Sequence, residues 1–295
     1  MSDPQVRPEL FGALRRPYYL VAPDYTQISG GVRAMHYLCH ALNLAGEDAY
    51  ITTTAVHPEL RTPTLVQSQA EVHTAAGRRP IAVYPEIVTG NPLGASTVAR
   101  YLLAEPGSIN GAQLELAPGD LVYTFGPSLV PTGWSAYLLR MPLVDTRVFH
   151  ADGVDDATRQ GSAVFINRHL DRGGSLDPIT ADSIEISRRV KERSATECAD
   201  IFRQVECLYL YEFSTIVFEA ILCGCPVVFI PNDVSQPDRD TTVWGGNGMA
   251  WNPSPAERAR ARATVGAARD CYAAEQREFW TQLSAFVDRT QSHTR

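Results

Sequence analysis

Hydrophobic and polar positions along the chain alternate in blocks that predict a strand, then a helix, then another strand. The apolar run 18–23 predicts a strand. After Gly30 and Gly31, apolar residues recur at helical spacing until Gly46, and residues 48–54 predict the next strand. A strand, a glycine turn, a helix and a second strand form the opening unit of a doubly wound α/β sheet.

The alternation continues to the middle of the chain, with one polar interval. Residues 55–79 are weakly periodic and predict a loop with a short helix. Asn91 and Pro92 predict the start of a helix that runs to Leu103. Further strands are predicted at 81–87 and 121–125, with 142–149 as an additional candidate.

A polar stretch at 150–161 carries no apolar pattern and predicts the boundary between two domains. Ser194 and Glu197 form a capping-box pattern at the start of a later helix, and Gly224 is placed to end the next one. The second series comprises strands at 162–166, 183–187, 207–211 and 227–231, and helices at 194–204, 215–223 and 255–289. Two such series predict two Rossmann-like domains, whose ligands bind beyond the carboxyl ends of the strands.

Composition excludes several classes of protein. The 295 residues are 44% hydrophobic and 20% charged, which is ordinary for a globular chain of about two domains. With 26 basic and 33 acidic residues, the net charge of −7 disfavours nucleic acid or an anionic membrane as a partner. The chain has no run of 18 apolar residues, and residues 1–16 carry no apolar signal core. We therefore expect a cytoplasmic protein without a transmembrane segment.

Lysine is nearly absent, which restricts how the chain can bind phosphate. Lys191 is the only lysine, and all other basic residues are arginines. A Walker A loop requires Gly-Lys, which occurs nowhere, so that type of nucleotide triphosphate site is excluded. Phosphate recognition must come from arginines, hydroxyl groups or helix N-termini. The six cysteines form no CxxC pair and lie mostly in apolar stretches, which is typical of structural thiols in a reducing compartment.

The most informative segment for function runs from 209 to 231. A strand ends near Tyr211, and a helix starts after it, where Ser214 or Thr215 can cap the helix beside a diphosphate. Glu219 lies in this helix among apolar neighbours, where an unpaired carboxylate is costly. We therefore expect Glu219 to be functional, because a carboxylate accepts hydrogen bonds from sugar or ribose hydroxyls.

This segment resembles the E-x7-E region of GT-B glycosyltransferases, especially those of the retaining family 4 type. The resemblance is carried by Glu219-Ala220 and by the run Gly224-Cys225-Pro226-Val227-Val228. Counting back eight positions from Glu219 reaches Tyr211, and the acid is its neighbour Glu212. Two further segments, within 28–38 and 84–107, resemble a subgroup of bacterial polysaccharide glycosyltransferases.

The resemblance implies a GT-B fold, in which two doubly wound Rossmann-like domains face each other across a cleft. Residues 1–150 would form the acceptor-side domain and residues 151–271 the domain that binds the nucleotide sugar. The helix at about 272–295 would cross back to the first domain. The resemblance also implies a transferase of hexosyl or deoxyhexosyl type in polysaccharide biosynthesis. Such an enzyme would be metal-independent, would retain the anomeric configuration and would use no cofactor besides its donor.

Candidate site residues follow from their places at strand ends and from the resemblance. Arg168 and Glu212 are the catalytic candidates, and Arg168 would offset charge that develops on the donor diphosphate. The candidates for binding the nucleotide sugar are Gly30, Gly31, Arg168, Arg172, Arg188, Tyr211, Glu212, Phe213, Ser214, Thr215 and Glu219. The candidates for the acceptor or the cleft are Glu86, Asn91 and His150, and no residue is assigned to a metal.

The leading hypothesis is a glycosyltransferase that moves a sugar from a nucleotide diphosphate sugar to a glycan or small-molecule acceptor. One alternative is a degenerate GT-B scaffold that binds a sugar nucleotide or a partner without turnover, and Tyr211 in the first motif position is compatible with it. The other is an NAD-dependent sugar-nucleotide oxidoreductase or epimerase. Neither domain has the GxGxxG that such an enzyme uses, and Lys191 cannot complete a Tyr-x-x-x-Lys.

Overall fold

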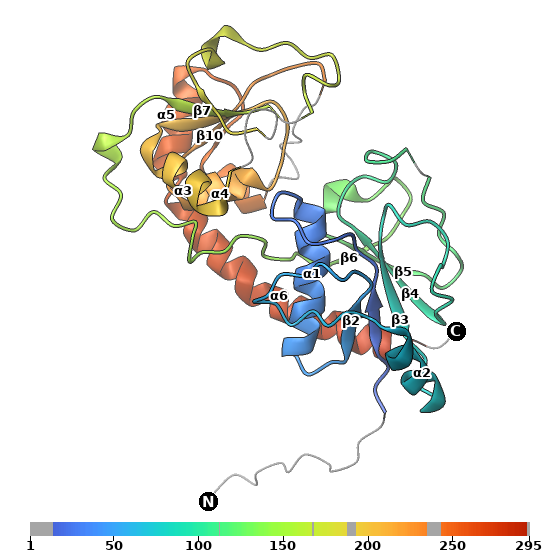
Figure 1. Ribbon diagram of the computed structural model, residues 1–295. Coiled ribbons are helices and arrows are strands. Elements are labelled where there is room, and N and C mark those ends of the chain that lie inside the picture. Colours follow the sequence, from blue (N-terminus) through green and yellow to red (C-terminus); the bar gives the residue numbers. More distant parts are fainter. Residues whose placement is uncertain (1–13, 112, 167, 188–192, 235–242, 294–295) are drawn as a thin grey trace, which may run out of the picture.

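The chain folds into two parallel α/β sheets, each with its own core (Figure 1). The computed structural model describes residues 14–111, 113–166, 168–187, 193–234 and 243–293. In that part of the chain, the first sheet has six strands and the second has five. The expected α/β class is confirmed, with two separate parallel sheets that have helices packed on them.

The first sheet is built around β1 (Tyr18–Leu20), which pairs with a strand on each side. The strand order is β2-β1-β3-β4-β5-β6, and every pairing is parallel. The other strands are β2 (Ala49–Ile51), β3 (Ile81–Pro85), β4 (Thr97–Leu102), β5 (Leu121–Thr124) and β6 (Tyr137–Leu138). Because all strands are parallel, their carboxyl ends lie along one edge of the sheet, which faces the second domain.

Helix α1 (Gly30–Leu44) covers one face of the first sheet together with the end of α6 (Ala267–Ser292). Tyr18 and Leu20 of β1 pack there with Met35 of α1 and Phe286 of α6. Short α2 (Gln67–Ala75) lies against the other face, where His73 and Tyr19 share a hydrogen bond of 2.8 Å. The alternation of Tyr18 and Leu20 toward one face and Tyr19 toward the other is the period of two that a strand imposes.

The helix expected from Asn91 to Leu103 is wrong, because this segment is a turn followed by strand β4. Asn91 does not start a helix, and its side chain holds the turn by bonding both the N–H and the carbonyl of Ala95. All six residues of β4 are buried, because Ala99 packs into the core with α1 and α6 and Val98 packs into another cluster on the opposite face. A strand covered on both faces has no amphipathic period, so its apolar residues were misassigned to a helix.

The strand proposed at 142–149 is also not formed. That segment is a loop, and the edge of the sheet is instead the two-residue β6. Its apolar residues Leu143, Val144 and Phe149 are buried all the same, because they pack under the crossing helix and into the two cores. Burial of these side chains therefore does not require strand pairing.

The second sheet has the order β11-β10-β9-β7-β8, again with parallel pairings. Its strands are β7 (Ser162–Phe165), β8 (Ile184–Glu185), β9 (Cys207–Leu210), β10 (Val227–Phe229) and β11 (Met249–Ala250). Helices α3 (Ala195–Gln204) and α4 (Ile216–Leu222) pack on one face and α5 (Pro255–Thr264) on the other. Ser194 and Glu197 form the predicted capping box of α3. Gly224 follows α4 with a φ of 75°, as a glycine C′ residue does.

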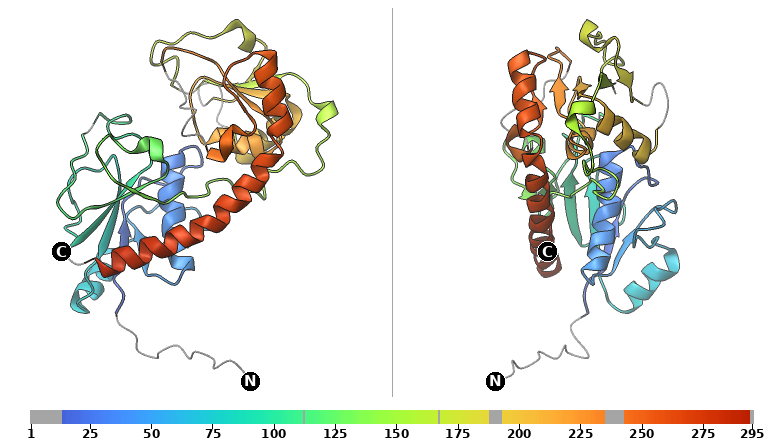
Figure 2. Two further views of the ribbon diagram at one scale, coloured as in Figure 1. Left: turned by 180° about the vertical axis from the view of Figure 1, so that it is seen from behind. Right: turned by 90° about the vertical axis from the view of Figure 1, so that its left-hand side faces the viewer.

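Helix α6 joins the two domains over 26 residues (Figure 2). Near its start Tyr272 belongs to the core of the second domain, and farther on Phe286 belongs to the core of the first. At its end, Thr290 shares a hydrogen bond of 2.7 Å with the buried hydroxyl of Tyr18. The last turn of α6 is therefore fixed to the first strand of the chain. No helix in the described residues is both long and apolar enough to span a bilayer.

Candidate functional site

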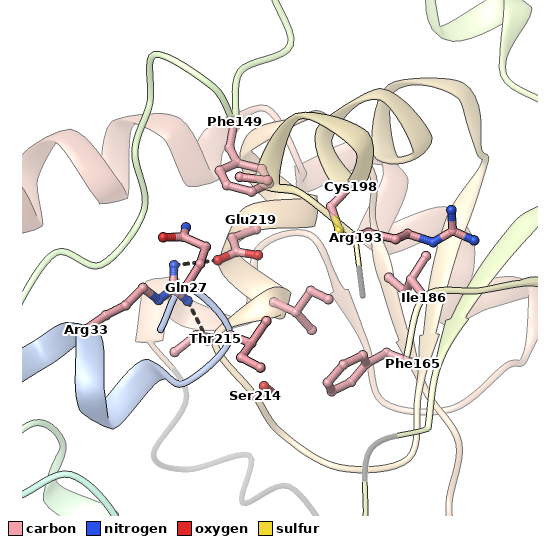
Figure 3. Close-up of a pocket in the computed structure, with 13 residues that line it drawn as sticks. Gln27, Arg33, Phe149, Phe165, Ile186, Arg193, Cys198, Ser214, Thr215 and Glu219 are labelled. Atoms are coloured by element: carbon pink, nitrogen blue, oxygen red, sulfur yellow. Dashed lines mark hydrogen bonds and ion pairs between the residues drawn. The ribbon is translucent and has the colours of Figure 1, made fainter. Parts of the chain in front are cut away.

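A pocket lies between the carboxyl ends of the second sheet and the beginning of α1 (Figure 3). It is lined by residues of both domains. Those of the first domain and the junction are Gln27, Ile28, Arg33 and Phe149. Those of the second domain are Phe165, Ile186, Arg193, Ala195, Cys198, Ser214, Thr215, Ile216 and Glu219. Of the predicted site residues, Ser214, Thr215 and Glu219 thus come together in one place.

The pocket is small in this conformation, and it is open to solvent. Its cavity volume of about 70 Å³ accommodates about five water molecules at up to 15 Å³ each. Pockets for small organic ligands enclose about 300–1,000 Å³. A ligand as large as a nucleotide would therefore extend beyond the pocket in this conformation, or the pocket would have to widen around it.

An ion pair between the domains forms one wall of the pocket. Arg33 of α1 donates from Nη1 to Oε1 of Glu219 in α4 over 2.8 Å. Its Nη2 donates to the hydroxyl of Thr215 over 3.0 Å, and Nη1 also reaches the carbonyl of Leu143 at 3.3 Å. Arg33 is only 2% exposed and Glu219 8% exposed, so this contact is shielded from water.

Burial sets the electrostatics of Glu219. Removal from water raises the pKa of this carboxyl, and the positive charge and hydrogen bond of Arg33 pull it back down. A buried ion pair is weak support for stability in itself, but the loss of one partner leaves an uncompensated charge. The carboxylate of Glu219 is therefore held in place by a residue from the other domain.

The first glycine of the turn packs closely against the second domain. A Cβ atom added to Gly30 would lie 2.6 Å from Cγ2 of Thr215. At Gly31 the nearest atom would be Cβ of Leu103 at 3.8 Å, an ordinary contact. Close approach at Gly30 is thus required by packing against α4. Thr215 makes no cap bond to α4, contrary to the prediction, because its hydroxyl accepts from Arg33.

Glu212 connects the loops that follow two neighbouring strands. Its Oε1 accepts the backbone N–H of Arg168 over 2.8 Å, which ties the loop after β9 to the loop after β7. Its Oε2 lies 4.0 Å from Nη2 of Arg168 and 3.9 Å from Nη1 of Arg172. Both guanidinium groups are about two-fifths exposed, whereas the Glu212 carboxylate is 5% exposed. The two arginines can therefore meet a ligand, and Glu212 positions them.

Tyr211 and Phe213 have opposite environments. The Tyr211 side chain is 1% exposed, stacks on His169 at 4.3 Å, and accepts the backbone N–H of Asp177 at its hydroxyl. These contacts are internal to the second domain. Phe213 is 39% exposed and stacks on Phe229 at 6.0 Å, which leaves part of the ring open at the carboxyl end of β9. Arg188 lies outside the described residues.

The three residues predicted for the acceptor or the cleft do not line the pocket. Glu86 is 4% exposed, its Oε2 accepts the N–H of Leu103, and burial raises the pKa of its carboxyl. Asn91 is part of the turn before β4. His150 lies at the junction of the domains, where Nδ1 is 3.5 Å from Asp152. Glu86 and Asn91 thus support the fold of the first domain.

Sequence analysis did not find Arg33, although the sequence contains a signal for it. Arg33 follows the glycine turn by two residues, at a position of the first helical turn that is otherwise surrounded by apolar residues. A charged residue there needs a partner. The partner is 186 positions away in the sequence, so the helix pattern alone does not identify it.

Comparisons with known proteins returned structures but no sequence family. No family model matches the chain, and no curated protein matches it. A spinosyn rhamnosyltransferase, SpnG, is similar over 91% of this chain and 96% of its own, with 13% identity and a TM-score of 0.41. The glycosyltransferase SnogD from Streptomyces nogalater is similar over 88% of this chain and 95% of its own, with 16% identity and a TM-score of 0.44. A glycosyltransferase from Rickettsia africae covers 94% of both chains at 9% identity and a TM-score of 0.46. At these values we take nothing about activity from them.

Proposed function

We propose that this chain is a glycosyltransferase that uses a nucleotide diphosphate sugar. The observation that carries the proposal is the pocket between the domains, where the buried Glu219 carboxylate is aligned by Arg33 at the carboxyl ends of the second sheet. Ligands of open α/β sheets bind at this edge. A carboxylate that lines a pocket is suited to accept hydrogen bonds from ribose hydroxyls.

The walls of the pocket support a nucleotide as its occupant. Phe165 and Ile186 provide apolar surface for a base, and Ser214 provides a hydroxyl beside Glu219. Ligand pockets are mostly apolar, with a few polar groups that fix orientation. The surface of the pocket therefore has the chemical character that a nucleoside requires.

Catalysis would depend on stabilising the leaving group. The bond between the anomeric carbon and the diphosphate oxygen breaks, the acceptor oxygen forms the new bond to that carbon, and the proton of the acceptor hydroxyl passes to the departing diphosphate. Negative charge then develops on the diphosphate, and the guanidinium groups of Arg168 and Arg172 are oriented by Glu212 to offset it. Because these arginines supply the positive charge, we propose a metal-independent reaction. Retention of the anomeric configuration is proposed on the resemblance of residues 219–228.

A second candidate function is supported by one observation. Glu212, a predicted catalytic residue, accepts a hydrogen bond from the backbone of Arg168, and Glu219 in the pocket is paired with Arg33. A protein that binds a sugar nucleotide without turnover is compatible with this arrangement. It differs from the transferase in one measurable way, since it would bind the donor and release no diphosphate.

The test is binding followed by turnover. Thermal unfolding is measured with uridine, guanosine, thymidine, adenosine and cytidine diphosphates and with NAD. A ligand at a hundredfold excess over its Kd stabilises the folded protein by about 2.7 kcal/mol. We expect stabilisation by one diphosphate, which is lost in Glu219→Gln and kept in Glu71→Gln, an exposed control on α2. Release of that diphosphate from its sugar donor then separates the transferase from the binder. Stabilisation by NAD alone, or by no nucleotide in folded protein, would refute both.

A further inference from the structure

Arg33 belongs to the first domain, but its bonding partners belong mostly to the second. It occupies the first turn of α1, and its guanidinium reaches Glu219 and Thr215 of the second domain (Figure 3). The two terminal nitrogens make all of these bonds. The third nitrogen, Nε, is buried and has no acceptor among the described residues. Buried N–H groups nearly always have an acceptor, and this one can donate to an oxygen atom of a ligand.

The charge in the pocket indicates the same kind of partner. The charged side chains of its described lining are Arg33, Arg193 and Glu219. Figure 3 shows that the Arg193 guanidinium points away from Glu219, so Arg33 is the cation that faces the carboxylate. With two arginines and one glutamate, the lining carries a net positive charge. An anionic ligand would balance this charge, and a ribose alone would not.

We infer that Arg33 is the first domain's ligand for the diphosphate of the donor. The inference rests on the proposed function and adds one residue to its site. In this assignment the terminal nitrogens keep Glu219 aligned for the ribose, while Nε donates to a diphosphate oxygen. One planar guanidinium can bind two oxygen groups at once, which a lysine ammonium does less specifically. Binding of the diphosphate would then add a second partner to the contact that Arg33 already makes with the second domain.

The experiment compares a nucleoside diphosphate with its nucleoside. Calorimetric Kd values are measured for uridine diphosphate and uridine, or for the pair whose base the stability panel selects. The proteins are wild type, Arg33→Met, Arg33→Lys and the control Arg277→Met, an exposed arginine on α6. We expect Arg33→Met to weaken binding of both ligands, because Glu219 loses its alignment. Diphosphate binding should weaken by about 10- to 100-fold more than nucleoside binding, which is the worth of one hydrogen bond to a charged group. The Kd values of Arg33→Lys should lie between those of wild type and Arg33→Met, and the Kd values of Arg277→Met should match those of wild type.

The outcomes distinguish this role from others. Equal losses for diphosphate and nucleoside would mean that Arg33 acts only through Glu219, and would overturn the assignment. Tighter diphosphate binding in Arg33→Met would also overturn it, because Arg33 would then compete with the donor for Glu219. If Arg33→Met does not fold, the ratio of the two Kd values in Arg33→Lys decides, and an unchanged ratio refutes the inference. A wild-type protein that binds neither ligand refutes the proposed function itself.

Discussion

Gly30 offers a direct test of how closely the two domains are packed. Its φ is not in the left-handed region, so alanine is compatible with the backbone. The new methyl group would nevertheless lie 2.6 Å from Cγ2 of Thr215, where ordinary contacts start at 3.4 Å. One of the two groups must therefore move by about 0.8 Å. Thr215 cannot rotate freely, because rotation would break its hydrogen bond to Arg33.

The size of the effect follows from two opposing contributions. Overpacking of a well-packed contact costs about 1–3 kcal/mol. Replacing glycine by alanine in a helix gains up to about 1 kcal/mol. We therefore expect Gly30→Ala to lower the free energy of unfolding by about 1–2 kcal/mol. Gly31→Ala is the matched control, since its methyl group would meet Leu103 at an ordinary 3.8 Å, and it should be neutral or stabilising by up to about 1 kcal/mol.

A double-mutant cycle with Thr215→Ser assigns the cost to one methyl group. Serine lacks Cγ2 but keeps the hydroxyl that Arg33 uses. In that background Gly30→Ala should lose most of its cost, which gives a coupling energy of about 1–2 kcal/mol. Urea unfolding of the four proteins measures this coupling energy, provided that the m value, the slope of unfolding free energy against urea concentration, is the same in all four. A coupling below about 0.5 kcal/mol, or equal effects of Gly30→Ala and Gly31→Ala, would refute the close contact.

Three further predictions concern the ion pair, one buried acid and the last helix. Arg33→Met should lower the free energy of unfolding, measured in urea, by about 3–5 kcal/mol, because it leaves the Glu219 charge buried without a partner. Adding Glu219→Met should restore most of this free energy, because no unpaired charge then remains. Glu86 has a pKa raised by burial above its usual 4.5, so its contribution to stability is fully present below pH 4.5 and is lost as pH rises through the folded pKa. The stability of wild type relative to Glu86→Gln should therefore fall from pH 4.5 toward neutrality, and a rise would contradict the burial. Tyr18→Phe removes the hydrogen bond to Thr290 and should lower the free energy of unfolding by about 0.5–1.5 kcal/mol. Amide hydrogen exchange at the end of α6 should become faster. Unchanged exchange there would show that this bond does not fix the helix.

The sequence determined those features whose signals are local. The alternation of strand and helix patterns predicted two α/β series, and both sheets are present. The capping box of Ser194 and Glu197 and the glycine after α4 were also predicted, because each signal spans only a few residues. Glu219 was selected because an acid on an otherwise apolar helix must have a partner. Such patterns depend on backbone geometry near the residue and need no knowledge of distant contacts.

Local patterns failed where the neighbours of a segment decided its structure. Residues 97–102 are a strand because β3 and β5 pair with its two edges, while its side chains are buried in separate clusters on both faces of the sheet. The sequence of that segment contains no amphipathic period that would distinguish a buried strand from a helix. The segment 142–149 is buried without strand pairing, since its side chains pack into cores formed by other elements.

Only the tertiary structure decided which residues meet at the site. Glu219 pairs with Arg33 across 186 positions, and Glu212 holds the backbone of Arg168 across 44 positions. Both contacts depend on the order of strands in a sheet and on how one domain packs against the other. The same packing left Glu86 and Asn91 outside the pocket, although they follow strand β3 as predicted. The sequence thus determined which elements form and where ligands bind relative to them, whereas domain packing selected the side chains that line the pocket, because contacts between distant segments leave no local pattern in the chain.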